Sequence, residues 1–175
     1  MDTALIVACS SLVLAAASLG WQVATWHMDG RRVRVALLHG LVSGGGVYSG
    51  KVEARGHPRD LKPLYRQGIR GTEVIGVAVT NVGRAPVRID RISIALAEGG
   101  MSYVPINETI GPALPHRLPP GETESWYAEA DAARALVSAT RAAGLRASDD
   151  VRAVVELGTG DEKRTRRTVT VGTAR

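Results

Sequence analysis

The sequence contains little of the chemistry on which small enzymes and metalloproteins depend. Of its 175 residues only Cys9 is a cysteine, and phenylalanine is absent. A single cysteine excludes an internal disulfide, and because Cys9 lies inside an apolar run, the rest of the chain has no thiolate site. The core of a folded domain must therefore be built from valine, isoleucine, leucine and alanine with a few tryptophans and tyrosines. The lack of disulfides is compatible with the cytoplasm.

Charged side chains are absent from the first apolar run, Thr3 to Trp26. A helix rises about 1.5 Å per residue, so a run of this length can cross a bilayer core of about 30 Å. Its serine hydroxyls can bond to carbonyls of the preceding turn. We therefore predict that residues 1–28 form a transmembrane anchor. The residues that we expect to contact lipid or its interface are Leu5, Ile6, Val7, Leu12, Val13, Leu14, Leu19, Trp21 and Trp26.

Two other interpretations of this run stay open. A cleaved signal peptide would account for the short apolar stretch before Ala15-Ala16-Ala17. A signal peptide should begin with lysine or arginine side chains, whereas Asp2 is the only charged side chain before the run. A buried core helix would account for the apolar character, but a domain of this size seldom hides so long an uncharged helix at its terminus.

Lysine and arginine are absent from the amino side of the run. All 22 of them lie from Arg31 onward, and the formal net charge is +5. Basic flanks tend to stay in the cytoplasm, so we expect a single-pass protein of the cell membrane with its amino terminus outside and its carboxyl-terminal domain in the cytoplasm. Arg31, Arg32 and Arg34 would attract anionic lipid headgroups, at about 1 kcal/mol for each charge near the surface.

The remainder of the chain is dominated by short alternating runs typical of strands. A phase slip near Asp90-Arg91 predicts a β-bulge. Helical spacing over Asp131–Ala143 predicts a helix, with Asp131 as its amino cap and Gly144 just past its end. Residues 29–175 are therefore expected to form a mainly β domain, an immunoglobulin-like β-sandwich with one inserted short helix. The strands are expected at 32–38, 47–55, 73–82, 87–96, 101–106, 122–128, 150–157 and 165–171, with loops at Gly40–Gly46 and Gly56–Thr72.

Two segments carry a resemblance to known modules. Residues Val77–Ile89, with Asn81-Val82-Gly83-Arg84-Ala85-Pro86 as their turn, resemble the strand–turn–strand centre of bacterial immunoglobulin-like or fibronectin-like modules. Residues Leu114–Glu122 resemble the proline-glycine lead-in to a later strand of such modules. With the Leu19-Gly20-Trp21-Gln22 helix end, the chain is similar to small membrane-anchored β-sandwich proteins of actinobacteria and their phages. The resemblance implies a fold and an anchor, and brings no catalytic residues.

No motif predicts a catalytic, cofactor or metal site. Gly44-Gly45-Gly46 lacks the Lys-Ser/Thr that follows in a phosphate-binding loop. The acidic pairs at 149–150 and 161–162 are adjacent in sequence, and neighbours on a strand point apart. We therefore expect no enzymatic activity, no cofactor and no small-molecule substrate. None of the histidines has metal-ligand spacing, so they are expected to be ordinary surface or interface residues: His27, His39, His57 and His116.

Two basic groups are candidates for a contact surface. Their side chains are either simply solvated or face lipid or an acidic partner, and nucleic acid is not expected because aromatic residues do not alternate with the arginines. One group lies in the connection after the second strand and the other in the last hairpin. The members are Arg55, Arg59, Lys62, Arg66 and Arg70, and Lys163, Arg164, Arg166 and Arg167.

These observations predict a membrane-anchored β-sandwich that acts as a non-catalytic protein-interaction or assembly module. Membrane lipid and an unidentified protein would be its partners, with edge strands and the two long loops as contact surfaces. The alternative is an exported or cell-surface structural domain, reached through a signal peptide or reversed topology. A third and less favoured hypothesis is an enzyme whose site is assembled only in three dimensions.

Overall fold

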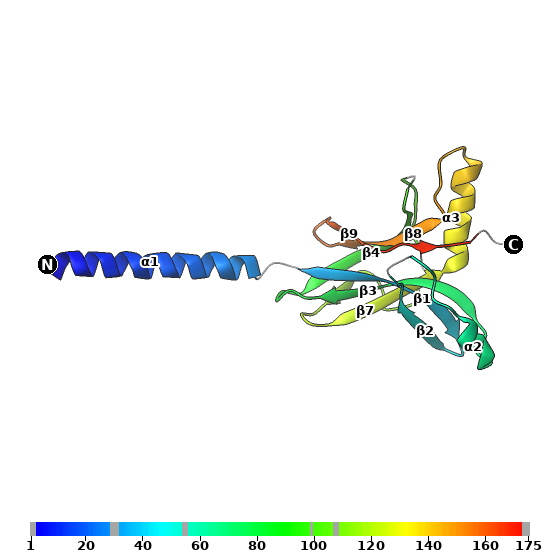
Figure 1. The fold of residues 1–175 in the computed structure, drawn as a ribbon, viewed down its shortest axis with the longest axis horizontal. Helices are drawn as coiled ribbons and strands as arrows, with labels where there is room; N and C mark the ends of the chain where they lie inside the picture. Colours follow the sequence, from blue (N-terminus) through cyan, green and yellow to red (C-terminus); the bar gives the residue numbers. More distant parts are fainter. Residues whose placement is uncertain (1–2, 29–31, 54–55, 99, 107–108, 173–175) are drawn as a thin grey trace.

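The chain forms one long amino-terminal helix, α1 (Thr3–Met28), followed by a domain of two antiparallel sheets (Figure 1). The computed structural model describes residues 3–28, 32–53, 56–98, 100–106 and 109–172. The expected mainly β fold with an amino-terminal apolar helix is confirmed. The described residues include two further helices: α2 (Lys62–Arg66) connects β2 to β3 within the first sheet, and α3 (Ala130–Ala142) connects β7 of the first sheet to β8 of the second.

Each sheet combines strands that are distant in sequence. The first sheet has the order β2-β1-β3-β7, formed by β1 (Val33–Ser43), β2 (Gly46–Lys51), β3 (Thr72–Asn81) and β7 (Thr123–Glu129). The second sheet has the order β10-β8-β4-β5, formed by β4 (Val87–Leu96), β5 (Ser102–Tyr103), β8 (Asp150–Leu157) and β10 (Val169–Thr170). Two short strands extend it: β6 (His116–Leu118) pairs with β4, and β9 (Glu162–Arg164) pairs with β8.

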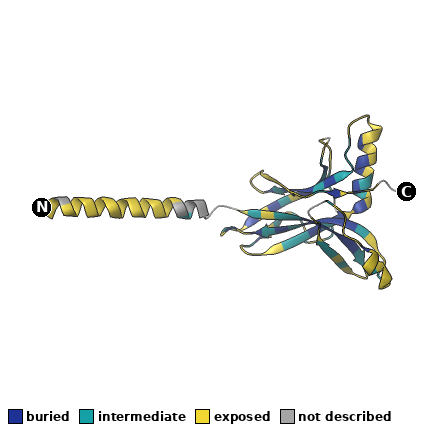
Figure 2. Cartoon of the chain, viewed as in Figure 1, coloured by how far each residue is buried: buried dark blue, intermediate teal, exposed yellow. Residues whose placement is uncertain are grey.

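The core lies between the two sheets and is made largely of β-branched and leucine side chains. Figure 2 shows buried residues along the strands of both sheets. Val77 of β3 and Ile92 of β4 are buried in the same cluster. Trp126 of β7 is the largest fully buried side chain, and its indole N–H donates to the Pro112 carbonyl at 2.8 Å. The apolar stripe of α3, which includes Leu136, joins the same core.

Several local predictions are confirmed. Strands β4 and β8 have the predicted bounds, and the pairing of β4 with β8 shifts register between Ile89 and Arg91, where the bulge was expected. Gly144 follows α3 with a φ of 73°, as the residue after a helix often does. The predicted amino cap is wrong: the cap position is Glu129, and Asp131 lies inside the first turn.

Two predicted loops are also wrong in part. β1 continues through Gly40 to Ser43, and only Gly44 and Gly45 form the turn to β2. Both turn glycines have positive φ, 57° and 82°, the conformation that a two-residue hairpin prefers. The connection Gly56–Thr72 contains α2, a helix that the sequence did not predict. The final strand was expected over 165–171. In the structure only Val169–Thr170 of this range is a strand, β10, and the preceding strand β9 ends at Arg164.

Candidate functional site

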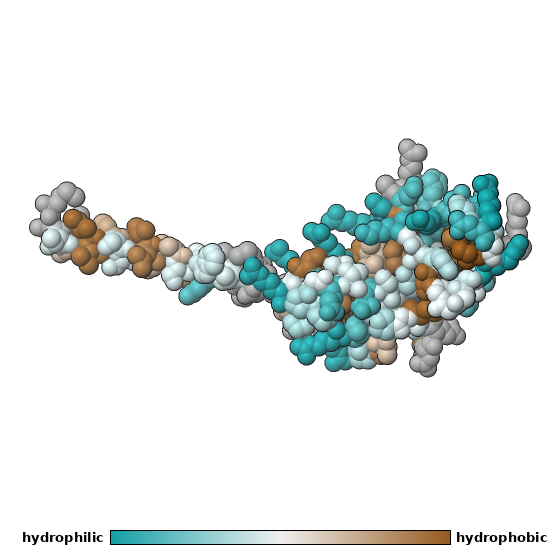
Figure 3. Space-filling model, turned by 90° about the horizontal axis from the view of Figure 1, so that it is seen from below, coloured by the Kyte–Doolittle hydropathy of each residue, from teal (hydrophilic) through white to brown (hydrophobic). Residues whose placement is uncertain are grey.

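The predicted anchor residues lie on a helix whose described side chains are almost all exposed. The window Ile6–Val23 has a mean hydropathy of 1.7, and none of it is buried by the domain. The hydroxyls of Ser10 and Ser11 donate to the Val7 carbonyl at 3.0 and 2.8 Å, so they are satisfied within the helix. Figure 3 shows its surface as mainly apolar or neutral, in contrast to the polar domain. This helix is therefore long and apolar enough to cross a membrane.

The individual anchor predictions can be placed on this helix. The side chains of Leu5 and Trp26 lie outside the described residues. The others are between 52% and 75% exposed, which leaves them free to contact lipid: Ile6, Val7, Leu12, Val13, Leu14, Leu19 and Trp21.

A groove of about 700 Å³ runs beside the first half of β1. One side is formed by Val33–Leu37 of β1 with Lys51 and Val52, and the other by the segment 163–167 that includes the end of β9. Figure 1 shows β9 at the same end of the sandwich as the start of β1, away from α2. We call this feature the basic groove, because its cationic lining residues are Arg34, Lys51, Lys163, Arg164, Arg166 and Arg167.

One inward-turned threonine arranges the four basic residues of the segment 163–167. Thr165 is only 2% exposed, and its N–H donates to the Ala153 carbonyl of β8 at 2.9 Å. Its hydroxyl oxygen accepts from the Ala153 N–H at 3.2 Å and donates to the Arg167 carbonyl at 2.9 Å. Thr165 therefore fixes the middle of the segment to β8, while the basic residues on either side of it stay exposed.

The segment is also fixed to the other sheet. The Arg167 guanidinium donates to the Val52 carbonyl, and the Val52 N–H in turn donates to the Leu37 carbonyl at 3.0 Å. Val52 is fully buried. These contacts connect β1, the residue after β2 and the segment 163–167, so the two walls of the groove are bonded to each other through Arg167.

All of the charged residues that line the groove are positively charged. None of the lining residues is acidic, and all six cationic residues are exposed. Among the described residues, only Arg164 of the six has a carboxylate partner, Glu162, at 2.9 Å between Nη2 and Oε2. Both of these side chains are more than half exposed, and such pairs contribute little. The groove therefore presents a concentrated positive field, suited to an anion or to a chain of carboxylates.

The structure brings together only some of the basic residues that the sequence singled out. Arg34 and the four residues of the last hairpin meet in the groove, where Lys51 joins them without having been predicted. Arg59 and Lys62 instead line a different hollow, next to His39. Arg32, Arg66 and Arg70 are exposed but line neither of these spaces. Arg31 and Arg55 lie outside the described residues.

A second cluster of charged groups joins β1, β3 and α3. The His39 Nε2–H donates to Glu73 Oε1 at 2.7 Å, and the other oxygen of Glu73 accepts from Arg134. Arg134 Nη1 also donates to Asp131 at 2.6 Å. The hydrogen bond from His39, helped by Arg134, outweighs burial and lowers the pKa of Glu73 to about 2.

The geometry of His39 is that of a structural group. Its Nδ1 accepts the Arg59 backbone N–H at 3.0 Å, so both ring nitrogens are engaged and neither is left to exchange a proton with a substrate. His39 is 2% exposed, which corrects the expectation that all histidines lie at the surface or an interface. The burial has a physical reason, because Glu73 and Arg59 satisfy both ring nitrogens.

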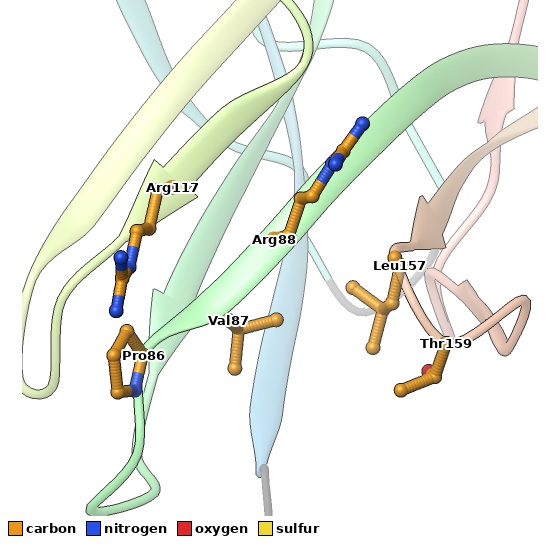
Figure 4. A pocket seen from close by; sticks show the side chains of 7 residues that line it. Pro86, Val87, Arg88, Arg117, Leu157 and Thr159 are labelled. Carbon is orange, nitrogen blue, oxygen red and sulfur yellow. The ribbon is translucent and has the colours of Figure 1, made fainter.

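A smaller hollow lies where β4, β6 and the end of β8 meet (Figure 4). Arg88 and Arg117 face each other across the β4–β6 register, but Figure 4 shows their guanidinium groups pointing apart. The Arg88 Nε donates to Asp90 at 2.6 Å. The hollow thus has no set of polar groups converging on one point, which a ligand site needs.

Neither metal-ligand geometry nor a matching protein family adds to this description. Among the described residues, no three histidine, cysteine, aspartate or glutamate side chains are grouped so that they could hold a metal ion. No protein-family model matches the chain, and no curated protein matches it.

Proposed function

We propose that this protein is a single-pass membrane-anchored β-sandwich of immunoglobulin-like type. It acts as a non-catalytic interaction module that holds an acidic protein partner beside the cytoplasmic face of the cell membrane. The observation that carries the proposal is the basic groove, which gathers six cationic side chains from three separate parts of the chain. The proposal is supported by the contacts that hold the basic residues beside this groove, the buried Thr165 bond to Ala153 and the part-buried Arg167 bond to the Val52 carbonyl.

The position of the groove in the chain supports a role at the membrane. Arg34 is six residues after Met28, the last residue of α1. Even a fully extended chain covers at most about 22 Å over that distance. With α1 in a bilayer, the groove therefore lies close to the lipid surface, and a partner bound in it is held there.

The proposed orientation rests on the distribution of basic residues. No lysine or arginine precedes Arg31. The side of the helix that carries the basic groove is the side expected to stay in the cytoplasm. Protease added to intact cells should leave the sandwich uncut and should digest it once the membrane is permeabilised. Digestion in intact cells, or a mature chain that starts near Ser18, would favour the exported alternative.

Charge reversal in the groove tests the interaction itself. The full chain is placed in nanodiscs of neutral phosphatidylcholine, and binding of a fluorescent oligoglutamate peptide is measured by anisotropy at several salt concentrations. We expect K163E/R166E to weaken binding at least tenfold. The matched control is R66E/R70E, which makes the same change of charge on α2 and just after it, away from the groove. Equal losses in the two variants would show attraction to net charge alone and would contradict the proposal.

A further inference from the structure

The strand that forms one wall of the basic groove is paired along only half of one edge. β3 pairs with β1 from Val33 to Val42, whereas β2 pairs with β1 only from Leu38 to Ser43. The stretch Val33–Leu37 therefore has a strand on one side and the groove on the other. An unpaired strand edge is a template on which another strand can add.

The hairpin register shows which backbone groups point into the groove. Ser43 and Gly46 close a two-residue turn, so they form a hydrogen-bonded pair, and such pairs recur at every second residue along an antiparallel ladder. The bond from the Val52 N–H to the Leu37 carbonyl continues this alternation. Val33 and Val35 therefore direct their N–H and C=O groups toward the groove, whereas Arg34 and Ala36 direct theirs toward β3.

These backbone groups of Val33 and Val35 lie beyond the last residue of β2 that pairs with β1. Within the described part of the chain, no backbone or side-chain group is hydrogen-bonded to them on the groove side. Arg167 reaches past this edge to the Val52 carbonyl, which ends the line of β2. The open stretch thus begins where β2 ends and runs back to the start of β1.

The charges around this edge select what can pair with it. A second copy of the chain would bring the same six cations to the contact, and like charges in close contact oppose pairing. An acidic strand would gain from the same arrangement, since its carboxylates would lie among Arg34, Lys51 and the segment 163–167. The cations therefore exclude self-pairing and favour an extended acidic segment.

We propose that an extended acidic segment of a partner protein adds as a strand along Val33–Ala36, beyond Leu37, whose groove-side carbonyl already accepts the Val52 N–H. This inference rests on the proposed function, because it specifies how the acidic partner is held. Backbone hydrogen bonds to Val33 and Val35 fix the position of the segment, and its carboxylates contact the cations of the groove. The added strand covers the part of the β1 edge that β2 leaves open.

Backbone methylation of a peptide separates strand addition from simple charge attraction. The probe is a nine-residue peptide of alternating glutamate and threonine with blocked ends, added to the full chain in phosphatidylcholine nanodiscs. Two matched versions carry N-methyl groups on alternate amides, one on the glutamates and one on the threonines. An added strand offers only one of its two edges to β1, so we expect one version to bind at least tenfold more weakly and the other to bind like the parent.

The remaining outcomes distinguish the two proposals. If both methylated peptides bind like the parent, strand addition is wrong and the proposed binding of an acidic partner stands. Equal loss with both versions also contradicts strand addition. If the parent does not bind, both proposals are wrong. If phosphatidylserine nanodiscs, but no peptide, alter the resonances of 163–167, then the groove faces lipid rather than a strand.

Amide hydrogen exchange gives an independent measurement on the protein. In the free chain we expect the amides of Val33 and Val35 to exchange quickly and those of Arg34 and Ala36 slowly, because only the second pair is bonded to β3. The parent peptide should slow the first pair at least tenfold and leave the second pair unchanged. Uniform protection of all four amides, or none, would overturn the assignment.

Discussion

Replacing Glu73 with glutamine tests the charge network that connects β1, β3 and α3. In the folded protein the hydrogen bond from His39, together with Arg134, lowers the pKa of Glu73 from 4.5 to about 2. A carboxyl group with a depressed folded pKa stabilises the fold fully above its unfolded pKa. That stabilisation is lost as the pH falls from about 4.5 toward about 2. The variant E73Q lacks the charge and therefore lacks this contribution at every pH.

The expected magnitude follows from the shift. At 1.36 kcal/mol per pKa unit it corresponds to about 3 kcal/mol of unfolding free energy. The Glu73 side chain is 29% exposed, so solvent screening reduces the expected loss to about 2–3 kcal/mol near neutral pH. Glutamine keeps an oxygen for the His39 Nε2–H, but its amide N–H groups cannot accept from Arg134.

Urea unfolding of the full chain in detergent micelles measures this difference. The stability of the native chain minus that of E73Q should be about 2–3 kcal/mol at pH 7 and less than about 0.5 kcal/mol near pH 2. D131N is the control, since Asp131 is 75% exposed at the outer end of the network and its loss should cost at most about 0.5 kcal/mol. A native-minus-variant difference that does not change with pH would refute the role of the Glu73 charge.

Three further substitutions test other parts of the structure. L12K places a charge at the middle of the apolar helix, at a cost of about 2.5–3.5 kcal/mol for insertion, so sedimentation should find more of the full chain in the soluble fraction than for the native protein. T165V removes the hydroxyl that bonds to Ala153 and Arg167, and should lower the unfolding free energy by about 1–2 kcal/mol and weaken oligoglutamate binding. G40A puts a Cβ 2.1 Å from the Tyr48 carbonyl oxygen and should cost about 2 kcal/mol or more in thermal unfolding, whereas G46A, with its nearest such contact at 3.9 Å, should be almost neutral.

The sequence predicted those elements whose signal is local. Strands β4 and β8 alternate clearly over their whole length, and the phase slip at Asp90-Arg91 marks the bulge directly. The loop expected at Gly40–Gly46 is wrong in its first part because a glycine in the sequence indicates a turn only where the backbone needs a positive φ. At Gly40 the glycine is needed for a different reason, since the neighbouring β2 backbone leaves no room for a side chain.

The basic groove depends on contacts that no local pattern reveals. The sequence placed Arg34 beside the membrane and Lys163–Arg167 in a separate hairpin, and it gave Lys51 no special role. These residues meet because β2 stops at Lys51 and leaves half of β1 uncovered, where the segment 163–167 comes to lie opposite. Likewise, only the pairing of β1 with β3 and the packing of α3 bring His39, Glu73 and Arg134 together.

The short spacer between α1 and β1 has a consequence for the proposed interaction with a partner. Only residues 29–32 separate the two elements. With the helix inserted, the sandwich diffuses in a plane and meets other membrane-bound proteins in a layer a few nanometres thick. Within such a layer, tethered partners face each other at effective concentrations that reach the millimolar range. An interaction too weak to detect between free molecules in solution can therefore be saturated at the bilayer.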